Sequence, residues 1–272
     1  MITQTTPGLA LVLLTLFQNV VVAQSFRIAT YNVNYGNRRG DQVLDAIAVA
    51  RPDILCLQET TLQSEDFLRK ALRKPFPQFT SVGHKGNFLA ERFVFASSEK
   101  LQDVRFHPPA LGYFGFYTAA WPIEKREIRI INVHLTPFVV ERGSGFADAV
   151  AAISKTEEKH GGEIEAILET LDPKVPTIIC GDFNSLSTFR APQRLIENGF
   201  TDSFAAVNDE LEKHPTWHWP TRPIPLRLRI DYIFHSRHFE TVESKVLERE
   251  GSDHFLLVSE LRFVDDVSRH PK

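Results

Sequence analysis

Acidic, amide and imidazole side chains stand directly after apolar runs in this sequence. The segment IICGDFNS, residues 178–185, places Asp182 and Asn184 straight after residues typical of a buried strand. Burying such groups without partners costs roughly several kcal/mol each. The polar end of this strand would find partners if other strands end in the same way and their polar ends meet in one site.

Other apolar runs do end in this way. They deliver Asn32 and Asn34 in TYNVN, Glu59 in LQET, His134 in NVHLTP, Asp231 in RIDYIF, and Asp253 and His254 in GSDHF. Taken singly, an Asn or Asp at a strand end is usually a turn former, and a lone histidine is usually structural. Their recurrence along one chain predicts a shared site.

These residue types suit phosphodiester hydrolysis, which needs an activated water and donors or positive charge around the phosphorus. Glu59 offers the hard oxygen ligand that Mg²⁺ prefers, and Asn32 could add a neutral oxygen or hold the ligands in place. Asp182 could orient or deprotonate the water. On an extended backbone Asn184 faces the same side, and its amide could donate to a phosphate oxygen. His134 and His254 are candidate donors to the developing charge.

The elements that would position these groups are mainly strands. Apolar runs bounded by turn residues predict strands in SFRIATYNV, DILCLQE, ERFVFAS, YFGFYTAAW, IRIINVHL, VPTIICGDF, LRIDYIF and HFLLVSELRF. Helical spacing appears at residues 41–50, with Asp41 as N-cap, in GGEIEAILETLD and in APQRLIENG. Residues 137–162 look irregular and are either a loop beside the site or a plain surface connection. Many strands with fewer helices indicate two packed sheets with helices outside.

The order and wording of the motifs resemble the endonuclease/exonuclease/phosphatase superfamily, which has the DNase I-like fold. The likeness runs over residues 25–263, with GDFN and SDH as its most specific parts and QET and RIDYIF in support. The resemblance implies an α/β (α+β) class, a four-layered sandwich of two packed sheets flanked by helices, with one domain over residues 24–272. It also implies a metal-dependent hydrolase that acts on phosphoester bonds.

The resemblance further implies roles for individual residues. Asn32 and Glu59 would hold Mg²⁺, with Mn²⁺ as the alternative ion and Asp253 close enough to contribute. His254 would pair with Asp231 and act as a donor, or as the base. His134 would pair with a glutamate, for which Glu91 in AERFVFASSEKL stands at the matching point; an exposed strand-edge acid explains Glu91 equally well.

The substrate is less well defined by the sequence. Leu89 replaces the tyrosine of many relatives, no arginine matches the one in DNase I-like nucleases, and Asn34 stands where abasic-site endonucleases usually carry aspartate. The net charge of −3 disfavours a dedicated nucleic-acid-binding surface, whereas arginine clusters at 38–39 and 222–229 favour one. The candidate substrate contacts are Asn34, Arg38, Arg39, Tyr113 and Arg229.

Three functions therefore stay open. The first is a secreted or periplasmic nuclease-like phosphodiesterase acting on DNA or RNA. The second is a phosphatase or phosphodiesterase for lipid headgroups or small organic phosphates, and the least favoured is a catalytically silent binding module, because every hydrolytic group is present. We expect a monomer without a stable protein partner.

The N-terminal segment and the cysteines bear on the compartment. The apolar run at residues 9–23 is shorter than the roughly 20 residues of a membrane span and ends in a small-residue pattern typical of a cleaved signal peptide, although no Lys or Arg precedes it. Residues 1–23 are therefore predicted to be a signal peptide, with a membrane anchor as the alternative.

Cys56 and Cys180 lie in apolar runs and are expected to be buried thiols. Trp217 and Trp219 could stack on a base, dock to a lipid headgroup or close one end of the core.

Overall fold

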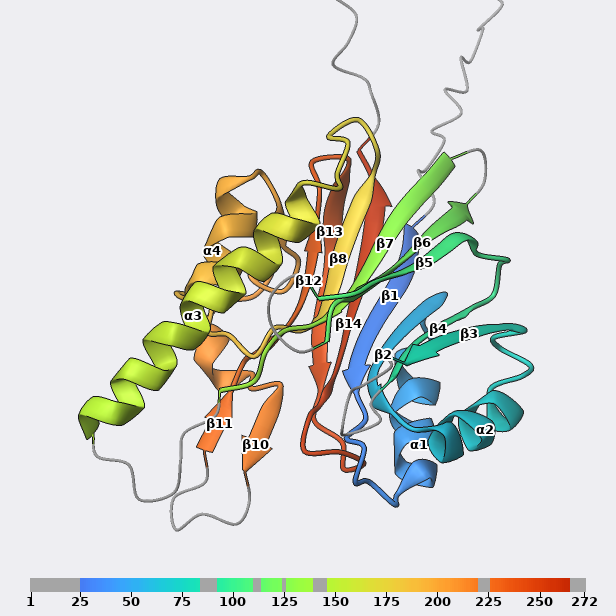
Figure 1. Ribbon diagram of the computed structural model, residues 1–272. Helices are drawn as coiled ribbons and strands as arrows, with labels where there is room; N and C mark the ends of the chain where they lie inside the picture. Colours follow the sequence, from blue (N-terminus) through green and yellow to red (C-terminus); the bar gives the residue numbers. More distant parts are fainter. Residues whose placement is uncertain are drawn as a thin grey trace, which may run out of the picture.

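Two six-stranded sheets lie at the centre of the protein (Figure 1). The structure is a computed structural model that describes residues 25–83, 92–109, 114–123, 126–138, 146–219 and 226–264, without the side chains of 146–150 and 219. The predictions for the segment 1–23 and for Glu91, Tyr113 and Arg222 fall outside these ranges. Within the described residues, no helix has both the length and the apolar character needed to cross a membrane.

The sheets mix parallel and antiparallel strands. The first sheet has the order β13 (Phe239–Leu247), β14 (Leu256–Phe263), β1 (Ser25–Asn32), β2 (Ile54–Thr60), β4 (Arg92–Ser97) and β3 (Gln78–Gly83). The second has the order β5 (Gln102–His107), β6 (Phe116–Ile123), β7 (Arg126–His134), β8 (Thr177–Asp182), β12 (Asp231–His235) and β9 (Thr201–Asp202). A separate hairpin joins β10 (Trp217–Trp219) and β11 (Leu226–Leu228).

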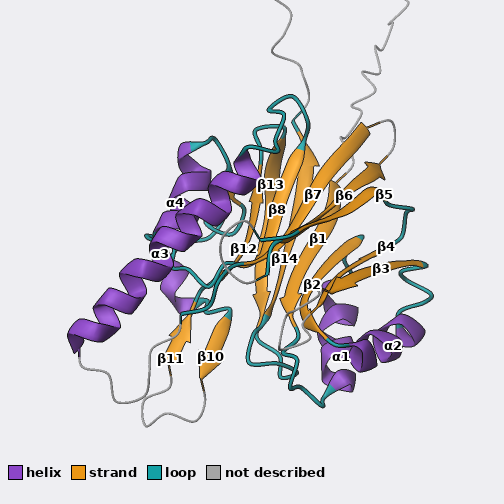
Figure 2. Cartoon of the chain, viewed as in Figure 1, coloured by secondary structure: helices purple, strands orange, loops and turns teal. Residues whose placement is uncertain are grey.

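Helices cover the outer faces of both sheets (Figure 2). They are α1 (Gly40–Ala50), α2 (Leu62–Ala71), α3 (Phe146–Leu168) and α4 (Arg190–Glu197), with a short 3₁₀ helix at Leu211–Lys213. Side chains of α1 and α2 share a buried cluster with the first sheet, and those of α3 and α4 share one with the second. The predicted four-layered α/β sandwich is confirmed.

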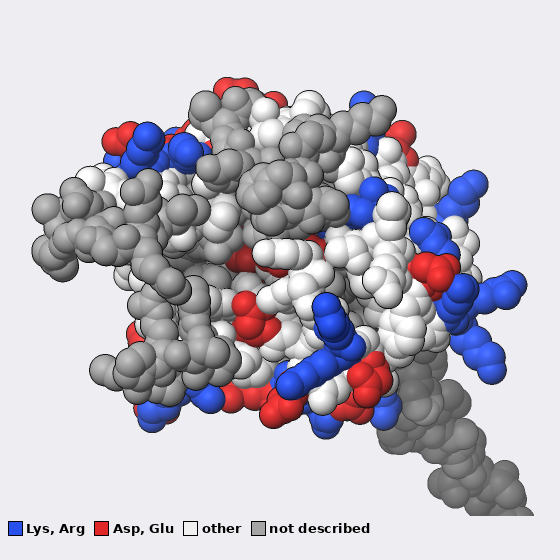
Figure 3. All heavy atoms as spheres, turned by 60° about the horizontal axis from the view of Figure 1, so that its bottom comes forward, with Lys and Arg blue, Asp and Glu red and all other residues white. Residues whose placement is uncertain are grey.

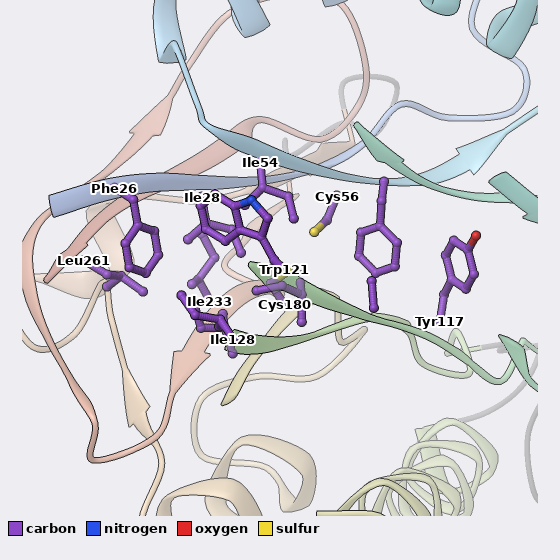
Figure 4. Close-up of a cluster of buried hydrophobic side chains, with 14 of the residues drawn as sticks. Phe26, Ile28, Ile54, Cys56, Tyr117, Trp121, Ile128, Cys180, Ile233 and Leu261 are labelled. Atoms are coloured by element: carbon purple, nitrogen blue, oxygen red, sulfur yellow. The ribbon is translucent and has the colours of Figure 1, made fainter. Parts of the chain in front are cut away.

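The two sheets bury a common core between them. Side chains of both sheets, such as Phe26, Ile54, Trp121 and Ile233, point toward one another in the space between (Figure 4). Successive residues of a strand point to opposite faces. In β8, residues 178 and 180 enter this core whereas residue 179 packs against the helices, so Asp182 lies on the inter-sheet face. Cys56 and Cys180 are buried free thiols in the same core, as expected.

The inter-sheet space becomes polar at one end. Gln58 donates from Nε2 to Asn132 Oδ1 over 2.7 Å and to Thr30 Oγ1 over 3.0 Å. Asn132 donates from Nδ2 to the carbonyl oxygens of Leu57 and Val94, at 3.0 and 3.1 Å. This buried layer separates the apolar core from the ends of the strands and satisfies its own polar groups, as buried amides require.

Two helical boundaries differ from expectation. Helix α3 begins at residue 146, so most of the stretch 137–162 that looked irregular is helical. The pattern was hidden because Thr156, Glu157, His160 and Glu163 are buried polar residues on the face where apolar spacing would be sought. Helix α1 begins at Gly40 with Arg39 in the N-cap position and no side-chain cap, so the expectation of Asp41 as N-cap is wrong.

Candidate active site

The polar ends of the strands gather at one edge of the sandwich. In the second sheet, His134 of β7 and Asp231 of β12 are both in register with Asp182 of β8. The first sheet contributes Asn32 from the end of β1 and Glu59 from β2. The segment before β14 adds Asp253 and His254 to the same cluster, as their contacts below show.

Asn32 joins the two sheets. Its amide nitrogen donates to Glu59 Oε1 over 2.8 Å and to Asp182 Oδ2 over 3.0 Å. Its Oδ1 accepts the backbone N–H of Asn34 over 3.0 Å. A backbone N–H can only donate, so this contact fixes the orientation of the amide. Asn32 therefore holds two carboxylates in place, and its role as a metal ligand stays a prediction.

Asp182 lies at the centre of the cluster and is buried. Its Oδ2 is 3.5 Å from His134 Nε2 and 3.6 Å from His254 Nε2. Its Oδ1 accepts the backbone N–H of Asn184 over 2.8 Å. Burial raises the pKa of Asp182 to about 7, and the charge of Asp231 acts in the same direction against His254 and the hydrogen bonds. This carboxyl group can exchange a proton near neutral pH.

The predicted pair of His254 and Asp231 is present in the structure. His254 Nδ1 and Asp231 Oδ2 are 2.9 Å apart, and both side chains are buried. Burial alone would lower the pKa of His254, but Asp231, Asp182 and Asp253 outweigh it and raise the pKa to about 10. His254 is therefore an imidazolium at neutral pH, with both ring nitrogens acting as donors.

His134, unlike His254, is uncharged at neutral pH. Burial, together with the positive charge of His254, lowers the pKa of His134 to about 3, which makes its imidazole neutral. The ring stacks on Phe114 with centroids 4.2 Å apart and planes 9° apart, and its Nε2 lies 3.8 Å from Glu59 Oε1. The expected partner Glu91 lies outside the described residues. The site thus combines one neutral and one charged imidazole.

The donor set fits a divalent cation. One ligand atom from each of Glu59, His134 and Asp182 lies within 4.8 Å of the others, as do those of Asp182, Asp231 and His254. With Asp253, four carboxylates of the described site face a single imidazolium, so the cluster has excess negative charge that a cation would offset. Burial raises the pKa of Glu59, and the hydrogen bond from Asn32 and the charge of His254 only partly oppose it.

Asp253 is separated from the candidate metal ligands. Its Oδ1 accepts from Asn34 Nδ2 over 2.8 Å and its Oδ2 from Trp217 Nε1 over 3.2 Å. Neither group of candidate ligands contains Asp253. Each Asp253 oxygen thus accepts one hydrogen bond from the protein, and the expectation that Asp253 contributes to metal binding stays a prediction.

Three residues of the site have left-handed backbone conformations. These are Asn34, Glu59 and Asn184, with φ of 57°, 55° and 46°. Glu59 also lies where the pairing of β2 with β4 shifts register. Such conformations cost about 1–3 kcal/mol each and are concentrated at functional sites. Each one turns a side chain away from the direction that the strand would give it.

Asn184 shows most clearly how a left-handed backbone conformation redirects a side chain. Strand β8 ends at Asp182, so the assumption that Asn184 continues on an extended backbone is wrong. Its amide nitrogen donates to the Leu135 carbonyl over 3.0 Å. Asn184 thus ties the exit of β8 to the exit of β7, and one of its two amide hydrogens is used inside the protein.

The predicted substrate contacts fall into two sets. Arg229 is buried, with Nη1 2.8 Å from Asp202 Oδ2 and its guanidinium over the ring of Tyr232. This corrects the expectation for Arg229, because a buried, paired cation cannot meet a ligand from solvent. Arg38 and Arg39 are exposed, and Asn34 and Arg39 line a groove of about 640 Å³ beside Asp253.

The groove lies on the same face as the catalytic cluster. Acidic side chains occupy the hollowed middle of this face, and several lysines and arginines lie toward its rim (Figure 3). Within the groove, Arg39 pairs with Glu250 at 3.2 Å and Arg227 with Glu248 at 3.5 Å. Both guanidinium groups therefore have carboxylate partners, and His218 and Phe255 supply aromatic surface.

Three residues that support the site were missed at the level of sequence, and the contact of a fourth, Trp217, was not predicted. Gln58 and Asn132 form the buried polar layer, Trp217 holds Asp253, and the Thr216 hydroxyl accepts the backbone N–H of Asp231 over 2.9 Å. The signal for the first two was present, since a single amide interrupts an apolar period-2 run in β2 and in β7. Nothing in the sequence around Trp217 distinguished a site contact from core packing.

Gly181 allows β7 and β8 to approach closely enough to bring His134 beside Asp182. Its φ is 145°, and a Cβ at this position would lie 1.9 Å from the Val133 carbonyl oxygen. We expect Gly181→Ala to lower the free energy of unfolding by at least about 2 kcal/mol, from steric overlap and backbone strain.

Urea denaturation of Gly181→Ala and Gly199→Ala measures this effect. Gly199 also has a left-handed conformation, with φ of 81°, but an added Cβ there meets nothing within 4 Å. The control should therefore lose only the conformational part, about 1 kcal/mol. Equal losses in the two variants would show that close approach of the strands is not the constraint.

Solved structures with the same architecture are known. An endonuclease/exonuclease/phosphatase from Beutenbergia cavernae DSM 12333 aligns with a TM-score of 0.68 and 20% identity over 88% of this chain and 72% of its own. A family protein from Bacteroides thetaiotaomicron aligns with a TM-score of 0.67 and 18% identity, over 89% and 99% of the two chains. TDP2 of D. rerio complexed with single strand DNA product aligns with a TM-score of 0.66 and 14% identity, over 88% and 99%.

Family membership is shown at the level of sequence. No curated protein matches the chain. The profile described as Endonuclease/Exonuclease/phosphatase family matches residues 29–254, a range that includes every strand end of the cluster described above. The chain therefore belongs to the Endonuclease/Exonuclease/phosphatase family and is a phosphoester-hydrolysing enzyme.

Proposed function

We propose that this enzyme is a Mg²⁺-dependent phosphodiesterase and that DNA or RNA is its leading substrate class. The observation that carries the proposal is the position of Asp182 Oδ2, between the Nε2 atoms of His134 and His254 at 3.5 and 3.6 Å. Asn32 ties the same oxygen to Glu59. A base, two imidazoles and a candidate metal carboxylate thus meet at one point.

The protonation states of Asp182, His254 and His134 give these three side chains different roles in catalysis. Asp182, with its pKa raised to about 7 by burial, takes the proton of the attacking water. His254 is an imidazolium and donates to a phosphate oxygen as negative charge develops there. His134 is neutral and contributes a single hydrogen bond without adding charge. Asp231 keeps His254 charged and oriented.

Glu59 is the residue best placed to hold the cation. Its side chain is 15% exposed, so it is the most accessible carboxylate of its ligand group, which has His134 and Asp182 at its inner side. Hard carboxylate oxygens match Mg²⁺, and Mn²⁺ accepts the same ligands. The bound cation would supply positive charge to the phosphate group, while the residues above orient the water and move its proton.

A second candidate substrate class is favoured by the groove beside Asp253. Because Arg39 and Arg227 are both paired with glutamates there, the described residues of the groove form no continuous basic path for a polyanion. A small phosphodiester or a lipid headgroup would need no such path. By contrast, the D. rerio TDP2 structure named above is complexed with a single strand DNA product, which supports nucleic acid as the leading class.

A substrate panel separates the two classes. The purified protein is offered plasmid DNA, RNA, sphingomyelin, inositol phosphates and a chromogenic bis-phosphodiester, each with Mg²⁺ or Mn²⁺ and each with EDTA. Asp182→Asn, prepared in parallel, reports contaminating hydrolases. Cleavage of a nucleic acid above all others supports the leading class. Absence of turnover on every phosphodiester would overturn the proposal.

Glu59→Gln tests the metal carboxylate directly. The change removes a negative charge but little volume, so the fold should persist while the Mg²⁺ concentration for half-maximal activity rises and kcat falls. We expect EDTA to abolish wild-type activity and Mg²⁺ to restore it. Glu260→Gln, on the far end of β14 where Glu260 pairs with Arg27 at 3.1 Å, is the control and should keep the wild-type dependence. Full activity in EDTA would contradict the metal-dependent proposal.

A further inference from the structure

Helix α3 presents a buried polar face to the segments that leave β7 and β8. Glu157, His160 and Glu163 occupy one side of this helix and are buried. Helix faces that pack on a core are normally apolar, and each buried polar group carries a desolvation cost unless it is bonded. All three side chains are bonded, and their partners lie in the two segments that follow His134 and Asp182.

Glu163 and His160 together bind every polar group of Thr136. Glu163 Oε1 accepts the Thr136 hydroxyl over 2.8 Å, and Oε2 accepts its backbone N–H over 3.3 Å. The Thr136 carbonyl oxygen is 2.6 Å from His160 Nε2. Thr136 follows His134 by two residues, so α3 fixes the backbone immediately beyond this imidazole.

Glu157 makes the corresponding contacts to the exit of β8. Its Oε2 accepts the backbone N–H of Arg190 over 2.7 Å, and its Oε1 accepts the Ser185 hydroxyl over 3.4 Å. The same Oε1 is 3.1 Å from His160 Nδ1. Both ring nitrogens of His160 therefore face acceptors. The imidazole links the two segments through one rigid group.

The segment between these contacts belongs to the catalytic cluster. The backbone N–H of Leu135 donates to the Asp182 carbonyl over 2.9 Å, and the Leu135 carbonyl accepts from Asn184 over 3.0 Å. Residues 134–136 are thus held on one side by Asp182 and Asn184 and on the other by Glu163 and His160. His134 has little freedom to move away from Asp182 while both sets of bonds persist.

We propose that Glu163 and His160 are positioning residues that hold the imidazole of His134 in register with Asp182 by binding Thr136. The proposal rests on the proposed function, because it gives His134 a place in turnover. Residues that orient a catalytic group in this way typically affect activity roughly 10–100-fold. A network that only filled space would affect the stability of the protein without a specific effect on kcat.

Thr136→Val and Thr136→Ser form a matched pair for the test. Valine keeps the volume and the backbone but removes the hydroxyl that Glu163 accepts, whereas serine retains it. With a chromogenic bis-phosphodiester, Thr136→Val and Glu163→Gln should each lose roughly 10–100-fold in kcat with KM much less affected, and Thr136→Ser should remain near the wild type. Glu165→Gln is the control on the same helix, since Glu165 is half-exposed and bonded to Arg194.

A second measurement does not depend on turnover. In ¹H–¹⁵N spectra of the imidazoles, the His134 signals should shift in Thr136→Val and Glu163→Gln and stay in place in Thr136→Ser and Glu165→Gln. If the wild type hydrolyses no phosphoester, the proposed function fails while these shifts still support the positioning role. Unmoved His134 signals, or a fall in the melting temperature of Thr136→Val and Glu163→Gln with their kcat retained, would overturn the inference.

Discussion

Asp231→Asn is expected to lower kcat by up to about 10⁴-fold, with KM changed far less, as in other histidine–carboxylate pairs. Asp231 Oδ2 is 2.9 Å from His254 Nδ1, and its charge is the main influence that raises the pKa of His254 against the cost of burial. Asparagine removes that charge and can present a donor to Nδ1, which would select the wrong tautomer. The loss appears at the transition state, where charge on the phosphate oxygens grows.

The double variant tests whether the two residues act as a unit. His254→Ala should cost about as much as Asp231→Asn, and the pair of changes scarcely more than the worse single one. The free-energy losses would add if the two residues worked independently, and additivity would therefore refute the pair. Asp202→Asn, which breaks the buried pair with Arg229, is the control: it should reduce stability and leave kcat unchanged.

Asp182→Asn is expected to lower kcat by about 10²–10⁴-fold, the usual contribution of a general base. The side chain keeps its size and its place next to Asn32, so substrate affinity should change much less. Retention of kcat within about tenfold would be too small a loss for a general base and would assign proton transfer to another group.

The role of Asp182 as the base also predicts the direction in which kcat/KM changes with pH. A base must be deprotonated to act, and burial raises the pKa of Asp182 to about 7, so kcat/KM should increase as the pH rises toward and through neutrality. A cation beside Glu59 favours the charged carboxylate, so this limb should move to lower pH as the Mg²⁺ concentration rises. In Asp182→Asn the limb should disappear. A limb that persists in the variant would belong to a different group.

The central strands of the fold were predictable from the sequence because buried strands consist mainly of apolar residues. All eight predicted runs form strands, since β1, β2, β7, β8 and their neighbours are apolar on both faces. The edge and short strands, among them β3, β5 and β13, were not predicted. Their residues are largely half-exposed, so neither periodicity nor composition distinguishes them from loops.

The site was predictable in its membership and less so in its geometry. Strand-end motifs named His134, Asp182, Asp231 and His254 correctly as neighbours. The register of β7, β8 and β12 aligns the first three, and His254 joins them through its contact with Asp231. The direction of Asn184 could not be derived, since it depends on a left-handed backbone after the strand.

The prediction of Arg229 in the basic cluster at 222–229 as a substrate contact was wrong for a different reason. Charge and spacing cannot show that Arg229 has Asp202 as a buried partner, because the two are brought together only by the tertiary fold. The contacts of α3 were equally hidden: buried Glu and His residues look like a solvated helix face when only the pattern is read.

The left-handed residues at positions 34, 59 and 184 limit how this enzyme can be stabilised. Glycine would adopt each of these conformations without steric strain, whereas Asn34, Glu59 and Asn184 carry side chains that such a backbone penalises. Engineering that relieves backbone strain by substituting glycine would therefore delete a side chain of the site at each of the three positions, so thermostability and activity oppose one another there.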